Sequence, residues 1–124
     1  MKLDDLMAKL GHRFTQPDLL KEALTHASYA HEHPQEGRDN ERLEFLGDAV
    51  LDLLVGEWLF LLKPELNEGD MSKRRAHSVR KSSLARLGDD LGLRPYLRMG
   101  QGLSGENATA AVLADAFEAV MGAL

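Results

Sequence analysis

Residues 40–50 read NERLEFLGDAV, and this stretch decides the fold because it opens the longest helix that the sequence predicts. Asn40 can cap the helix, which we expect to run to about Leu62, before Pro64 ends it. Successive residues of a helix are rotated by about 100°, so the acidic side chains of this helix fall on one stripe. The stripe consists of Glu41, Glu44, Asp48 and Asp52. The other faces are almost wholly apolar, which predicts that the helix lies in the middle of a domain.

A second helix repeats this arrangement near the end of the chain. We expect it to start at Asn107 or Thr109. Asp115 and Glu118 are the only charged residues after that start, and because they are three apart they share one face. The same face carries Gly122, whose small size would allow another helix to approach closely.

Carboxylate pairs on two apolar helices need compensation. Burying an unpaired carboxylate costs on the order of several kcal/mol, and neither helix places a lysine on its acidic face. Magnesium and similar hard cations take oxygen ligands, and helix bundles hold metal ions with carboxylates that project inward from facing helices. The two acidic pairs therefore predict a divalent cation site. These pairs are Glu44 with Asp48 and Asp115 with Glu118. For Glu41, the alternative to a role at the metal site is a solvent-exposed position near the start of the helix. For Asp52, a solvent-exposed position is the preferred interpretation.

The remainder of the chain also favours helix. Alanine and leucine are abundant, isoleucine is absent, and no run of β-branched residues alternates with a period of two. We therefore expect an all-α fold class, a compact multi-helix domain with about six or seven helices. Besides the two helices above, we expect helices at residues 2–10, 17–28, 68–81 and 84–92, and loops at residues 29–39 and 98–107.

Composition bounds the setting in which the protein works. A chain of 124 residues suits a single domain over residues 1–124. The absence of cysteine excludes disulfides and thiolate metal sites and fits a reducing compartment. The longest apolar stretch, residues 49–62, is interrupted by Asp52 and Glu57 and is shorter than the roughly 20 residues of a membrane span. We therefore expect a cytoplasmic protein that does not enter a membrane.

A basic run, KRRAHSVRK at residues 73–81, concentrates positive charge in a protein whose net charge is -5. On a helix, its members can face phosphates, which attract basic side chains without regard to base sequence. A solvated basic face is the alternative. The candidates for phosphate contact are Lys73, Arg74, Arg80 and Lys81. By contrast, His31 and His33 lie in an expected loop that offers no cysteine, so we do not predict a zinc site there.

NERLEFLGDAVL, residues 40–51, resembles the signature of the ribonuclease III family. Three further blocks resemble the family in the same order: LLKEALTHASYAHE, NEGDMSKRRAHSV and LADAFEAVMGAL. The resemblance implies a magnesium-dependent endonuclease that cuts both strands of double-stranded RNA in RNA processing. Manganese could replace magnesium. The products would carry a 5′ phosphate and a 3′ hydroxyl.

The resemblance also implies roles for individual residues. The metal ligands would be Glu44, Asp48, Asp115 and Glu118. The catalytic residues would be Glu41, Asp48, Glu68 and Glu118. Family members are homodimers, and the aromatic side chain at the position of Phe45 packs across the two-fold axis. Helical rotation agrees, because it places Phe45 beside the acids and partly away from the core; a core position is the alternative.

The sequence departs from the family pattern in three ways. The basic residue ahead of the last helix is missing from NATAAVLAD at residues 107–115, the family's further C-terminal helix is absent, and no double-stranded-RNA-binding domain follows. We therefore expect a catalytic domain with reduced RNA affinity. Two other interpretations remain open. They are a non-catalytic, dimeric RNA-binding scaffold on the same fold and an all-α, magnesium-dependent nucleotide pyrophosphatase.

Overall fold

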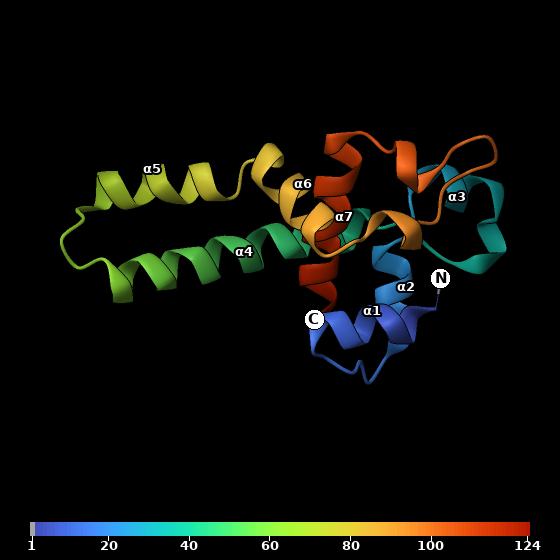
Figure 1. Cartoon of the computed structure of the whole chain (residues 1–124), viewed down its shortest axis with the longest axis horizontal. Coiled ribbons are helices and arrows are strands. Elements are labelled where there is room, and N and C mark those ends of the chain that lie inside the picture. The colour runs from blue at the N-terminus through green and yellow to red at the C-terminus, as the bar shows by residue number, and fades with distance from the viewer. Residues whose placement is uncertain (1) are drawn as a thin grey trace.

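A computed structural model describes residues 2–124, and within this range the backbone forms helices and loops without a β-sheet (Figure 1). The α-helices are α1 (Leu3–Leu10), α2 (Pro17–Ala23), α3 (Ala27–Glu32), α4 (Glu41–Leu62), α5 (Glu68–Ser78), α6 (Lys81–Asp90) and α7 (Ala110–Ala123). Three 3₁₀ helices join them: η1 (Pro34–Glu36), η2 (Arg94–Tyr96) and η3 (Gly105–Asn107). The predicted all-α fold class is confirmed.

Helix α7 forms the centre of the molecule and packs against α4, α6 and α2. Its sequence explains this position, because a helix that is apolar nearly all round needs cover on every side. Leucine side chains from the other elements close the core around it. They include Leu6, Leu20, Leu24, Leu84 and Leu93, each at most 2% exposed. Within residues 2–124, every helix is too short or too polar to cross a lipid bilayer.

Helix α4 lies in the core over only part of its length. Its first half crosses α7, whereas its second half pairs with α5 in a hairpin that extends away from the rest of the molecule (Figure 1). We call this hairpin, residues 53–78, the arm. Its large apolar side chains that remain at least 52% exposed are Leu53, Leu54, Trp58, Phe60, Leu61 and Leu62. Helix α5 cannot cover them, because Met71 and Ala76 are its only apolar side chains. The prediction that α4 lies in the middle of the domain is therefore wrong for this half.

The helix predicted at residues 17–28 is interrupted. Helix α2 ends at Ala23, because the next residues pair with a distant segment: the Arg98 N–H donates to the Leu24 carbonyl (2.8 Å) and the His26 N–H to the Arg98 carbonyl (2.9 Å). Helix α3 then begins at Ala27, with the His26 side chain accepting from the Ser28 N–H, and it continues into the predicted loop as far as Glu32. Local periodicity cannot reveal this pairing, which joins residues more than seventy positions apart.

Polar side chains cap α5 and α7, but the cap predicted for α4 is wrong. Asn67 accepts from the Asp70 N–H at 2.8 Å and so caps the start of α5. Thr109 accepts from the Val112 N–H at 3.2 Å and so starts α7. The Asn40 side chain does not cap α4; it is buried and donates to the Ala23 carbonyl at 3.1 Å.

The boundary between α5 and α6 also differs from the prediction. Helix α5 ends at Ser78 rather than near residue 81, and α6 already begins at Lys81. This shift moves Lys81 from the end of a basic helix to the first turn of a helix that packs against α7.

Candidate metal centre

The crossing of α4 and α7 brings the two backbones into direct contact. A Cβ atom at Gly47 would overlap the backbone carbonyl of Glu118, and one at Gly122 would overlap the carbonyl of Leu43. Both glycines therefore permit an approach that no larger residue allows. The prediction of a close helix approach at Gly122 is confirmed, whereas the matching role of Gly47 was not foreseen.

Three of the predicted acids converge at this crossing. Carboxylate oxygens of Glu44, Asp115 and Glu118 all lie within 4.8 Å of one another. Glu118 is 7% exposed, and the other two are half-buried. We call these three residues the acidic cluster. Asp48, one turn after Glu44, is exposed and lines the same cavity as Glu118. The cluster therefore combines one carboxylate from α4 with two from α7.

An open cavity of about 490 Å³ lies over the cluster. Its lining consists of Glu41, Glu44, Phe45, Asp48 and Glu118. Glu41 is exposed in the first turn of α4, where the Asp39 side chain accepts from its N–H at 3.0 Å. A ligand that enters this cavity therefore meets carboxylate oxygens on most sides.

The electrostatics of the cluster favour protonation of its buried members. Burial raises the pKa of Glu118 from its ordinary value of 4.5 to about 7, assisted by the neighbouring carboxylate of Asp48. Burial also raises the pKa of Glu44, and the charge of Asp115 adds to this effect. A divalent cation among these oxygens would reverse both shifts by favouring the charged carboxylates. The donors suit a hard cation such as magnesium, which binds a few carboxylates and keeps several waters.

Lys81 is a member of the site that sequence reasoning missed. Its Nζ donates to Asp115 Oδ1 at 2.8 Å. The pKa of Lys81 is raised, first by this hydrogen bond and then by the charge of Asp115 and the other cluster acids. Its place follows from the packing of α6 on α7, where Gly88 lies directly against Leu113. No local pattern indicates a contact across 34 positions. The structure places Lys81 in an ion pair within the site, and its contact with phosphates stays a prediction.

The remaining predicted residues lie outside the cluster. Glu68 is exposed at the start of α5, at the far end of the arm (Figure 1). Helix α4 rises about 27 Å between Glu44 and Leu62, so a single chain does not bring Glu68 to the cluster. Asp52 lies one turn beyond Asp48 and is not a member of the group. Phe45 is 82% exposed beside the acids, which confirms the prediction that it points away from the core.

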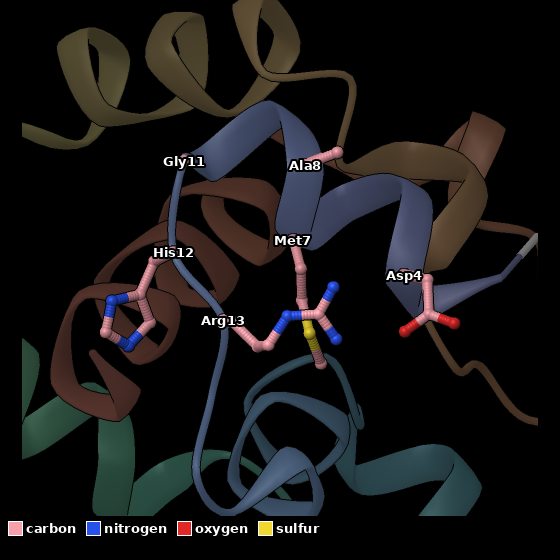
Figure 2. A pocket seen from close by; sticks show the side chains of 6 residues that line it. All are labelled: Asp4, Met7, Ala8, Gly11, His12 and Arg13. Carbon is pink, nitrogen blue, oxygen red and sulfur yellow. The ribbon is translucent and has the colours of Figure 1, made fainter.

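Two other places carry polar side chains without a comparable convergence. A cavity of about 290 Å³ beside α1 is lined by Asp4, Met7, Ala8, Gly11, His12 and Arg13. Figure 2 shows the side chains of His12 and Asp4 well apart in this view, with Arg13 and Met7 drawn between them. His33 stacks on Tyr29, with 4.1 Å between the ring centroids, and is therefore engaged in packing. Neither place gathers metal-binding side chains at one point.

Residues 16–124 match the profile of a protein family described as Ribonuclease-III-like. Ribonuclease 3 from Pseudothermotoga lettingae is 47% identical over 128 residues, which cover 98% of this chain and 54% of the relative. Ribonuclease 3 from Oleidesulfovibrio alaskensis is 48% identical over 125 residues, which cover 99% of this chain and 53% of the relative. The chain thus spans about half the length of the curated relatives that it matches.

Solved structures show the same architecture. Two structures of the nuclease domain of ribonuclease III from Campylobacter jejuni match with TM-scores of 0.87 and 0.85 at 40% and 41% identity. The matches cover 98% and 99% of this chain and 83% and 82% of the solved chains. One of these structures is described by its structural flexibility in the region involved in dimer formation.

Proposed function

Because the chain belongs to the ribonuclease III family, we propose that residues 1–124 form a nuclease domain that cuts double-stranded RNA with the help of a divalent cation. The observation that carries this proposal is the acidic cluster, in which α4 and α7 bring three carboxylate oxygens within 4.8 Å of one another. The cysteine-free composition supports a place in the cytoplasm.

The residues at the crossing of α4 and α7 fit a magnesium ion, which manganese could replace. The proposed ligands are Glu44, Asp48, Asp115 and Glu118. A bound cation would supply a nucleophile from water at neutral pH and neutralise charge on the phosphate. The buried Glu118 would hold the inner side of the site, and the exposed Asp48 would bind the cation from the open side of the cavity. Glu41, at the mouth of the cavity, would position water or substrate. The products would carry a 5′ phosphate and a 3′ hydroxyl.

The basic side chains that are not in the cluster would contact RNA. Lys73, Arg74 and Arg80 are all exposed on or just after α5. Double-stranded RNA is recognised through its shape, its phosphates and its 2′-hydroxyls, so a surface with spaced positive charges suffices without side chains that read bases.

A second copy of the chain is the proposed partner, with contact through the region of Phe45. This side chain is 82% exposed and lines a cavity of about 760 Å³ together with neighbours that include Leu19 and Leu46. An exposed aromatic ring beside a hollow lined by both apolar and charged side chains is typical of a protein interface. A catalytic role for Glu68 also requires a second chain, because its own chain holds it far from the cluster.

A cleavage assay on a labelled RNA duplex tests the proposal. We expect cutting with magnesium, none with chelator, and none of a nucleoside triphosphate. Substitutions Glu44→Gln, Asp48→Asn and Glu118→Gln should each reduce cutting by at least about a hundredfold, because each removes a metal-ligand charge. Asp52→Asn is the matched control on the same helix and should retain activity.

Three outcomes would contradict the proposal. A scaffold would bind the duplex without cutting it, and a pyrophosphatase would hydrolyse the triphosphate. Cutting that is unchanged by Asp48→Asn or Glu118→Gln would reject the assigned roles.

A further inference from the structure

Lys81 places a positive charge on the acidic cluster. Its Nζ lies 2.8 Å from Asp115 Oδ1, and the charges of Glu44 and Glu118 also act on it. The Lys81 side chain is 62% exposed, whereas Asp115 is 30% exposed. The ammonium therefore reaches the Asp115 carboxylate from the solvent side of the cluster.

We propose that Lys81 is a positioning residue of the metal centre: its ammonium acts as a tethered counter-ion that steadies the cluster before a cation arrives and weakens the affinity of the site for that cation. This inference rests on the proposed function, because it assumes that the cluster is a metal centre. It goes further in assigning a role to a residue from a third helix.

The steadying effect follows from charge. Carboxylate oxygens of Glu44, Asp115 and Glu118 lie within 4.8 Å of one another and repel one another when they are charged. A neighbouring ammonium lowers the repulsion among these carboxylates, which favours their approach at the crossing of α4 and α7. α6 can hold Lys81 in place because the contact between Gly88 and Leu113 packs it tightly on α7.

The effect on affinity follows from the same charge. An ammonium within about 5 Å of a bound divalent cation repels that cation. At the dielectric constant of water, this repulsion weakens the affinity of the site for the cation by about tenfold, and salt reduces the effect. The ion pair is exposed and therefore weak, and the lysine stem is flexible, so an arriving cation can displace the ammonium. Lys81 thus adjusts the affinity without closing the site.

Titration calorimetry with magnesium chloride and with manganese chloride tests the effect on affinity. Lys81→Met keeps the length of the side chain and removes its charge, and we expect it to bind each cation about fivefold more tightly than the unmodified chain. Lys81→Arg keeps the charge and should restore the original affinity. Lys21→Met is the matched control, since Lys21 is an exposed lysine on α2, and it should leave the affinity unchanged.

Thermal unfolding in chelator tests the steadying effect without any metal. At pH 8 and low salt, Lys81→Met should unfold about 3 °C or more below Lys21→Met, and the difference should shrink in 1 M salt.

Each failure has its own meaning. Equal affinities for Lys81→Met and the unmodified chain would overturn the role of Lys81 and leave the metal centre intact. Weaker binding by Lys81→Met would likewise overturn it, by showing that the ammonium assists the cation. Absence of cation binding by the unmodified chain would instead overturn the proposed metal centre, and with it this inference.

Discussion

At the scale of one residue, Glu118 shows how the proposed metal centre would oppose the stability of the fold. The side chain is 7% exposed, although a carboxylate is among the groups that gain least from burial. Burial and its acidic neighbours raise the pKa of Glu118 to about 7. The folded chain therefore favours the uncharged form of this carboxyl group up to about neutral pH. Such strain is expected where a site is built to receive a cation.

The pH dependence of stability follows from this shift. The carboxyl group has a pKa of about 4.5 in the unfolded chain and about 7 in the folded one. The protonated Glu118 carboxyl therefore stabilises the folded chain fully below pH 4.5, and this contribution to the free energy of unfolding is lost as the pH rises through about 7. The loss in the metal-free protein amounts to at most about 3 kcal/mol.

Glu118→Gln should remove this loss. We expect the variant to be more stable than the unmodified chain in chelator at pH 8 and to show little of its decline between pH 5 and pH 8, as measured by chemical denaturation. Glu57→Gln, an exposed position on the same helix as Glu44, should keep the decline. A steep decline that persists in Glu118→Gln would show that another group causes it.

At the scale of the element, the crossing of α4 and α7 depends on two glycines. Gly47 lies against the Glu118 carbonyl, and Gly122 lies against the Leu43 carbonyl. The positions of the acids depend on this contact, because Glu44 and Glu118 come from opposite sides of it. A side chain at the crossing would therefore separate the carboxylates as well as weaken the packing.

Gly47→Ala tests this dependence, with Gly56→Ala on the same helix as its control. The new methyl group at residue 47 would overlap backbone atoms, so we expect a loss of about 3 kcal/mol or more in the free energy of unfolding. At residue 56 the nearest atom is Arg75 Nη1 at 3.6 Å, an ordinary contact. Alanine there should stabilise the helix by about 0.5–1 kcal/mol. Similar stabilities for the two variants in urea denaturation would show that the helices can move apart freely.

The same elements show which features of the structure could be predicted from the sequence. Residues Glu44, Asp115 and Glu118 were found because each acidic pair is set by rotation within one helix, which is a local property. Lys81 was missed because its contact depends on how α6 packs against α7. The break after Ala23 was missed for a similar reason, since it follows from hydrogen bonds with Arg98. The exposed half of α4 misled the prediction because apolar composition does not reveal whether a partner is present.

At the scale of the whole molecule, the arm and Phe45 leave an unusual amount of apolar surface in contact with water. Phe45 is 82% exposed, and Trp58 in the arm is 53% exposed. Isolated apolar side chains on a surface are common, whereas a series of them along one helix is typical of an interface. The surface of a single chain is therefore consistent with the proposed pairing of two copies.

Phe45→Asp should convert a dimer into a monomer, because a charge in the centre of an apolar interface is left without a partner. Sedimentation velocity would measure the change, and circular dichroism should show an intact fold, since Phe45 contributes little to the core of its own chain. Leu103→Asp replaces an apolar side chain that is 55% exposed in the loop before η3, and it should leave the assembly unchanged. A dimer that survives Phe45→Asp would place the interface elsewhere.

The crossing of α4 and α7 also has a consequence for biosynthesis. Glu44 is translated early, whereas Asp115 and Glu118 follow some seventy residues later, in the helix around which the core is built. A nascent chain on the ribosome therefore cannot assemble the acidic cluster until α7 has left the exit tunnel and docked.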